Sequence, residues 1–173
     1  IIAIGDSVTI GLGLPVQDNY PSQLERKLRE LGYAYTIENA WISGDTSAWL
    51  LSRIDWILDG VTPDFVILCI GANDAFQWKS VDDIEKNIRS IIEKIRAKNI
   101  PIVFAVMNAP FNIGAEYRTQ YDGMYPRLAK EYKLDFMPFL LEWVALNQKY
   151  NQDDRIHPNR EWNTIVVNNI MEI

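Results

Sequence analysis

The sequence is poor in cysteine and histidine and carries more acidic than basic residues. Its 173 residues include one cysteine, Cys69, and one histidine, His157. One cysteine cannot form an internal disulfide, and one residue of each kind cannot build a cysteine–histidine metal cage. The net charge of −6 argues against a nucleic acid partner, because a polyanion requires clustered lysine and arginine. No apolar run approaches the roughly 18 residues that span a bilayer, so we expect no transmembrane segment.

The composition is typical of one globular domain. Hydrophobic residues make up 48 % of the chain, which is enough for a substantial core. There is no internal repeat, low-complexity tract or linker that would mark a boundary. We therefore expect residues 1–173 to form a single domain. The chain starts at Ile1 and shows no cleavable signal pattern, so the sequence leaves its compartment open: cytoplasm, periplasm or secretion.

Apolar runs rich in β-branched residues alternate with helical patterns. The pattern predicts strands over residues 1–5, 33–40, 63–72, 100–107 and 134–139. It predicts helices over residues 22–32, 47–60, 81–99, 116–132, 140–150 and 160–173. Gly32 is expected to end the first helix and Ser80 to cap the third, whereas Gly123 and Pro126 weaken the fourth. The expected fold class is α/β, a three-layer α/β/α sandwich with a central parallel five-stranded sheet.

Ligands of such sheets bind at the carboxyl ends of the strands. The segments that follow the first four predicted strands are GDS at 5–7, ISGDTS at 42–47, GAND at 71–74 and NAPFN at 108–112. Most of them combine glycine with small polar residues. Turn residues are common at strand ends, so each segment alone is modest evidence for a site.

Ser7 and His157 are the candidates for a nucleophile and its base. Ser7 follows the first strand on a Gly-Asp turn, although a serine that merely caps a helix would have the same neighbours. His157 is the single imidazole, and imidazole exchanges protons near neutral pH, but a lone histidine is often structural. Asp154, three residues before it, could orient the ring, with Asp153 as a rival.

Two further residues could stabilise an oxyanion together with the Ser7 N–H. Gly44 could present a backbone N–H with no side chain in the way, and Asn73 could present a side-chain amide. Taken singly, Gly44 is interpreted as a turn glycine and Asn73 as a loop residue. Their placement at consecutive strand ends favours the joint role.

Four segments give these residues a family context. In chain order, GDSVTIGLG, NAWISGDTS, IGANDAF and DDRIHPN resemble the four motif blocks of the SGNH hydrolases, the GDSL-type esterase and lipase superfamily. The likeness is greatest to its bacterial branch of thioesterase I, lysophospholipase L1 and arylesterases, and it spans residues 1 to about 171. The family's Ser, Gly, Asn and His, and the Asp before the His, match Ser7, Gly44, Asn73, His157 and Asp154. The departures are Val8 for leucine and Ala72 for glycine.

The resemblance implies a flavodoxin-like SGNH hydrolase fold and a carboxylic ester or thioester hydrolase that forms an acyl-enzyme on Ser7. His157 would be the base, Asp154 its orienting carboxylate, and Ser7, Gly44 and Asn73 the oxyanion donors. No metal or cofactor is implied. The expected partner is a small-molecule ester or thioester, bound by a soluble monomer.

The substrate groove is the least defined part of the prediction. The loops are short and form no long lid, so we expect short to medium acyl chains. Candidates for the groove are Asp6, Phe76, Trp78, Asn108, Pro110, Phe111 and Ile113. Ordinary core or loop packing is the alternative for the apolar members. Loop bracing is the other interpretation of Asp6; Asp45 and Asp74 are interpreted as loop-bracing acceptors, with a direct role as their alternative.

Three other functions stay open. One is a carbohydrate O-deacetylase of the same superfamily. Another is a non-catalytic binding domain, which the filled catalytic positions argue against. The third is a flavodoxin-like nucleotide binder, which the sequence disfavours because it has neither a P-loop nor a dinucleotide fingerprint.

Overall fold

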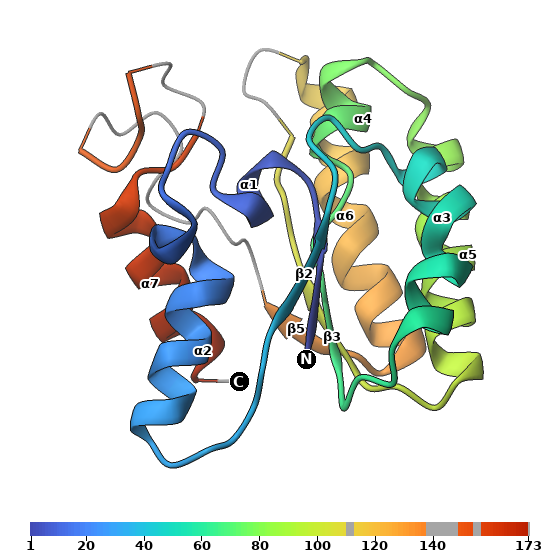
Figure 1. Ribbon diagram of the computed structural model, residues 1–173. Coiled ribbons are helices and arrows are strands. Elements are labelled where there is room, and N and C mark those ends of the chain that lie inside the picture. Colours follow the sequence, from blue (N-terminus) through green and yellow to red (C-terminus); the bar gives the residue numbers. More distant parts are fainter. Residues whose placement is uncertain (110–112, 138–148, 154–156, 173) are drawn as a thin grey trace.

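A computed structural model describes residues 1–109, 113–137, 149–153 and 157–172 (Figure 1). Its centre is a five-stranded parallel sheet with the strand order β2-β1-β3-β4-β5. The strands are β1 (Ile2–Gly5), β2 (Glu38–Trp41), β3 (Val66–Leu68), β4 (Ile102–Ala105) and β5 (Asp135–Met137). The predicted α/β class with a five-stranded parallel sheet is confirmed.

Helices cover both faces of this sheet. They are α1 (Ser7–Ile10), the 3₁₀ helix η1 (Val16–Asp18), α2 (Tyr20–Glu30), α3 (Ser47–Gly60), α4 (Ala72–Phe76), α5 (Val81–Ala97), α6 (Ala115–Tyr132) and α7 (Arg160–Ile170). Figure 1 shows α3, α5 and α6 on one side of the sheet and α2 beside α7 on the other. The arrangement is the predicted three-layer sandwich.

Successive side chains of a strand point to opposite faces of the sheet, so apolar residues at successive positions make both faces of the sheet apolar. In β1, Ile2 and Ile4 belong to the core beneath α3, α5 and α6, whereas Ala3 belongs to the core beneath α2 and α7. Strands that are buried on both sides must be apolar at every position, which is the pattern seen in the sequence. Cys69 lies in the second core and is fully buried, and burial raises the pKa of its thiol.

Several predicted boundaries differ from the structure. The second strand starts at Glu38 instead of residue 33, because the apolar residues before it pack from irregular backbone; Tyr35 makes an edge contact with Phe65. The helix predicted over residues 22–32 corresponds to α2, which starts earlier, at Tyr20. Asn19 caps α2, because its Oδ1 accepts the Ser22 N–H at 2.9 Å. Tertiary packing and a cap thus override the local periodicity.

The predicted helix ends agree with the structure in part. Gly32 follows the first helix with φ +88°, as expected of a stop. Ser80 is the N-cap of α5, as predicted, although its hydroxyl makes no capping hydrogen bond. Pro126 lies within α6 without interrupting it. The prediction of a helix over 140–150 falls mostly outside the described residues.

Two short helices, α1 and α4, are absent from the sequence-based prediction. They contain four and five residues, too few for a helical period to be visible. Each begins within four residues of the end of a central strand, at the carboxyl edge of the sheet, and they carry two of the candidate site residues. None of the described helices combines the length and hydropathy of a membrane span.

Candidate active site

Ser7 is the first residue of α1, and only Asp6 separates it from the end of β1. Asp6 caps the helix, with Oδ1 accepting the Val8 N–H at 3.0 Å. The tight passage from strand to helix requires glycine at position 5, since a Cβ there would collide with Thr9 Oγ1 and lie 2.8 Å from the Cys69 carbonyl oxygen. The fold therefore presents Ser7 at the carboxyl edge of the sheet.

His157 lies in the segment that precedes α7, and its Nε2 is 3.1 Å from Ser7 Oγ. The two residues are 150 positions apart in the chain. The segment is anchored by α7, whose N-cap Asn159 accepts the Trp162 N–H at 3.2 Å and whose Trp162 is fully buried. The structure thus brings together the serine and histidine that the sequence singles out. Asp154 lies outside the described residues, and Asp153 is exposed.

Gly44 and Asn73 lie at the ends of the strands on either side of β1. Gly44 has φ +79°, and a Cβ on it would meet nothing within 4 Å, so that face of the turn is open. The interpretation of Asn73 as a loop residue is wrong, because it lies in the first turn of α4. Its Nδ2 donates to Asp6 Oδ2 at 3.1 Å and to the Asp45 carbonyl oxygen at 3.0 Å. One side-chain amide therefore ties the three segments that follow β1, β2 and β3.

Asp6 is a buried carboxylate that contacts both the start of α1 and Asn73. It is 1 % exposed, and burial raises the pKa of its carboxyl to about 6, while the Val8 N–H and the His157 charge act in the opposite direction. Both carboxylate oxygens have protein donors. This geometry fits the alternative of a loop brace better than a substrate contact.

Two more buried carboxylates hold the same region. Asp74 accepts the backbone N–H and the hydroxyl of Ser47, both at 2.7 Å, which joins α4 to the start of α3. Asp45 pairs with Arg53 of α3, whose Nε is 2.9 Å away, and Arg53 also donates to the Ala40 carbonyl oxygen at 3.2 Å. Burial raises the pKa of both carboxyls, and the Arg53 charge opposes this at Asp45. These contacts hold the turn that carries Gly44 and the helix α4 that carries Asn73 against α3.

Comparison with known proteins places this geometry in a family. The GDSL-like lipase/acylhydrolase family model matches residues 3–164. The chain belongs to this family. By that membership it is a carboxylic ester hydrolase of the GDSL type.

Curated relatives and solved structures agree with this assignment. An arylesterase of Vibrio mimicus is 34 % identical over 161 residues, covering 93 % of this chain and 80 % of the relative. Thioesterase 1/protease 1/lysophospholipase L1 of Escherichia coli is 32 % identical, covering 93 % and 76 %. The crystal structure of TesA superposes with a TM-score of 0.94 at 30 % identity over 99 % of this chain and 95 % of the other. AlinE4, an SGNH-hydrolase family esterase, gives 0.85 at 37 % identity over 99 % and 92 %.

In this GDSL hydrolase, α4 is supported by a pair of tyrosines, Tyr121 and Tyr125, that were not predicted from the sequence. Tyr125 of α6 donates its hydroxyl hydrogen to the Ile70 carbonyl oxygen at 2.8 Å, and the Tyr121 hydroxyl lies 2.7 Å from that of Tyr125. Both hydroxyls press against Gly71, which has φ +120° and precedes α4. The pair therefore sets the backbone two residues before Asn73. The only sequence signal is the spacing of four residues along α6.

The predicted groove residues divide into three groups. Phe76 and Trp78 are 54 % and 63 % exposed, so the core-packing alternative is wrong for them. Ile113 is buried in the core beneath α3, α5 and α6, so its assignment to the groove is wrong. Asn108 is exposed, while Pro110 and Phe111 lie outside the described residues.

Trp78 has an unusual backbone conformation for a large residue. Its φ is +55°, at the end of α4, where glycine is common. Its ring lies 6.0 Å from that of Tyr117, whose hydroxyl donates to the Lys79 carbonyl oxygen at 2.7 Å. These contacts hold an exposed indole just after the helix that carries Asn73.

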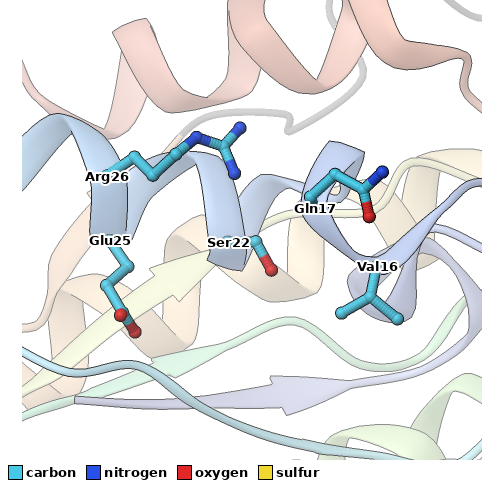
Figure 2. A pocket seen from close by; sticks show the side chains of 5 residues that line it. All are labelled: Val16, Gln17, Ser22, Glu25 and Arg26. Atoms are coloured by element: carbon cyan, nitrogen blue, oxygen red, sulfur yellow. The ribbon is translucent and has the colours of Figure 1, made fainter.

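One pocket of about 330 Å³ lies elsewhere. It is lined by residues of η1 and the first turns of α2, namely Val16, Gln17, Ser22, Glu25 and Arg26 (Figure 2). None of the candidate site residues contributes to it. Glu25 already binds the Ile37 N–H at 2.8 Å, so the pocket gives no indication of a second site. Within the described ranges, no cluster of His, Cys, Asp and Glu could hold a metal ion.

Proposed function

We propose that this GDSL hydrolase cleaves carboxylic esters or thioesters through an acyl-enzyme on Ser7, with His157 as the base. The observation that carries the proposal is the 3.1 Å approach of His157 Nε2 to Ser7 Oγ. A serine hydroxyl is a weak nucleophile until a base within hydrogen-bond reach takes its proton. This distance is within that reach.

In the proposed reaction, Ser7 Oγ attacks the acyl carbonyl while its proton passes to His157 Nε2. Asp154 orients the imidazole and stabilises its charged form. His157 then gives the proton to the leaving alcohol or thiol, and water repeats the cycle on the acyl-enzyme. The N–H groups of Ser7 and Gly44 and the Asn73 amide hold the oxyanion, and loss of one such donor lowers the rate by about 100- to 1000-fold.

The contacts of Asn73 define how it could serve as an oxyanion donor. Its amide nitrogen already donates to Asp6 and to the Asp45 carbonyl oxygen. These bonds fix the amide before substrate arrives, so no reorganisation is needed during the reaction. In the proposed transition state, the N–H directed at Asp6 is shared with the oxyanion.

We propose short to medium acyl chains as the preferred substrates. The support is the exposure to solvent of Phe76, the last residue of α4, and of Trp78, which follows the C-cap of that helix. Such side chains offer an apolar wall for an acyl or aryl group and no deep tunnel for a long chain. The names of the relatives, an arylesterase and a thioesterase/lysophospholipase, are compatible with this range.

The test is hydrolysis of p-nitrophenyl esters from acetate to palmitate by the parent and by Ser7→Ala. We expect turnover by the parent and a loss of at least about 10⁴-fold in Ser7→Ala. Ser52→Ala, at an exposed position of α3, is the matched control and should match the parent. Equal activity of the parent and Ser7→Ala would refute the nucleophile, and a rate that keeps rising beyond twelve carbons would refute the chain-length proposal.

A parallel assay on acetylated xylo-oligosaccharides tests the O-deacetylase alternative. Hydrolysis of these sugars far faster than p-nitrophenyl butyrate would favour the alternative. No contact in the described residues favours it.

A further inference from the structure

Gln152 lies between the two segments that carry Ser7 and His157. Its backbone N–H donates to the His157 carbonyl oxygen at 2.8 Å. Its side-chain Nε2 donates to the Leu12 carbonyl oxygen at 2.6 Å and to the Pro158 carbonyl oxygen at 2.9 Å. One glutamine therefore binds the histidine segment twice and the segment after α1 once.

The contact with Leu12 continues directly to the serine. The Leu12 N–H donates to the Ser7 carbonyl oxygen at 3.0 Å, where it closes the last turn of α1. A chain of hydrogen bonds thus runs from Ser7 through Leu12 and Gln152 to His157 and Pro158. It connects the backbones of the two residues whose side chains meet at 3.1 Å.

The turn after α1 is shaped around this glutamine. Gly13 has φ +85°, and a Cβ on it would collide with Gln152 Oε1. A glycine at this position lets the backbone approach the side-chain amide closely. The amide is therefore confined on its Oε1 side by Gly13 and on its Nε2 side by two carbonyl oxygens.

The elements on either side have little rigidity of their own. α1 contains four residues, and His157 precedes α7 without belonging to a helix. Their relative position must come from tertiary contacts, and a misplacement of about 1 Å between reacting groups can lower a rate by about 100-fold. The geometry points to Gln152 as a positioning residue that sets the distance between Ser7 Oγ and His157 Nε2. This inference rests on the proposed roles of Ser7 and His157.

The test is Gln152→Met, which keeps the length and neutrality of the side chain and removes its N–H donors. Gln120→Met is the matched control, because Gln120 is exposed on α6, on the opposite face of the sheet. The measurements are kcat and KM on a soluble p-nitrophenyl ester and the rate of Ser7 labelling by a fluorophosphonate, each normalised to the folded fraction from circular dichroism.

We expect kcat and the labelling rate of Gln152→Met to fall together by about 10- to 100-fold, while KM changes by less than about threefold. His157 is the sole histidine, so its imidazole NMR signals need no assignment. These signals should move in Gln152→Met and stay in place in Gln120→Met. A merely structural role would lower the unfolding temperature and leave the rates of the folded fraction and the imidazole signals unchanged.

Gly13→Ala provides a second, independent route to the same contact. Its Cβ should displace the Gln152 amide, so this variant is expected to lower kcat by a similar factor. The double variant should lose little more than either single variant, because both changes break one contact. Strictly multiplicative losses would show that Gly13 acts independently of Gln152 and would contradict the proposed clamp.

The outcomes separate this inference from the proposed function. If Ser7→Ala is inactive and Gln152→Met has the kcat, labelling rate and imidazole signals of the parent, the positioning role is refuted and the nucleophile stands. If Ser7→Ala retains full activity, the proposed function fails, and this inference fails with it.

Discussion

Replacing Gly71 by alanine tests how tightly the tyrosine pair confines α4. The new Cβ would collide with the Tyr125 hydroxyl and lie 2.8 Å from that of Tyr121. The Tyr125 hydroxyl cannot withdraw freely, because its ring is fully buried and it donates to the Ile70 carbonyl oxygen. The backbone has φ +120°, a conformation that alanine rarely adopts. Two separate costs are therefore expected.

The magnitudes of these costs can be estimated from similar cases. Backbone strain at such a φ costs about 1–3 kcal/mol, and overpacking of a buried contact adds about 1–3 kcal/mol. Gly32→Ala is the matched control, because Gly32 has φ +88° but a Cβ there would meet nothing within 4 Å. We expect Gly32→Ala to lower the unfolding free energy through backbone strain alone. Gly71→Ala should lower it by about 1–3 kcal/mol more, the cost of overpacking.

Urea unfolding followed by circular dichroism measures both variants, and the ester assay follows the site. Gly71→Ala should also lower kcat, because Asn73 follows two residues later in α4. Tyr125→Phe removes the colliding oxygen, so in the double variant Gly71→Ala should cost less than it does in the parent. If Gly71→Ala destabilises no more than Gly32→Ala, the close contact with the tyrosines is refuted.

Two further predictions concern the carboxylates behind the site. The pKa of Asp6 is about 6 in the folded protein, above its ordinary 3.8, so folding favours the protonated carboxyl. The contribution of Asp6 to the unfolding free energy is therefore fully present below pH 3.8 and is lost as the pH rises through about 6. The unfolding free energy of the parent minus that of Asp6→Asn should therefore fall by about 3 kcal/mol from about pH 3 to pH 7, and a flat difference would contradict the burial argument. Arg53→Lys keeps the positive charge but loses the planar guanidinium that holds Asp45, so it should lower the unfolding free energy by about 2 kcal/mol. It should also lower kcat by about 10-fold, because Gly44 is the residue before Asp45 and depends on the same contact for its position. Urea titration and the ester assay check this, and unchanged values for both would contradict the bracing role.

The sheet could be predicted from the sequence because burial on both faces leaves a strong local signal. Residues such as Val66, Ile67 and Leu68 are apolar in succession, and α5 repeats isoleucine at helical spacing. Strands and helices that alternate in this way have few possible arrangements. The short helices α1 and α4 leave no such signal, although they position Ser7 and Asn73. Their sequences contain turn residues, and their helical state depends on contacts such as the Asp6 cap.

The residue types of the site and the bracing role of Asp45 and Asp74 could be predicted, but the other supports could not. Ser7, Gly44, Asn73 and His157 follow from strand ends and from a family resemblance. Gln152 and the tyrosine pair act through tertiary contacts over many residues, so no local spacing marks them. Asp6 illustrates the limit, because its position next to Ser7 makes it a candidate for a substrate contact. The residue is only 1 % exposed, and this burial follows from packing that the sequence does not display locally.

The distance of 150 residues between Ser7 and His157 also determines when activity can arise during folding. β1 pairs with both β2 and β3, so the serine segment has its strand partners early in the chain. The histidine segment is anchored by α7, whose Trp162 fills the core against the sheet. Under the proposed roles of Ser7 and His157, a chain whose last helix has not docked has the nucleophile without its base. Under the same proposal, esterase activity during refolding is expected to recover no earlier than the docking of α7.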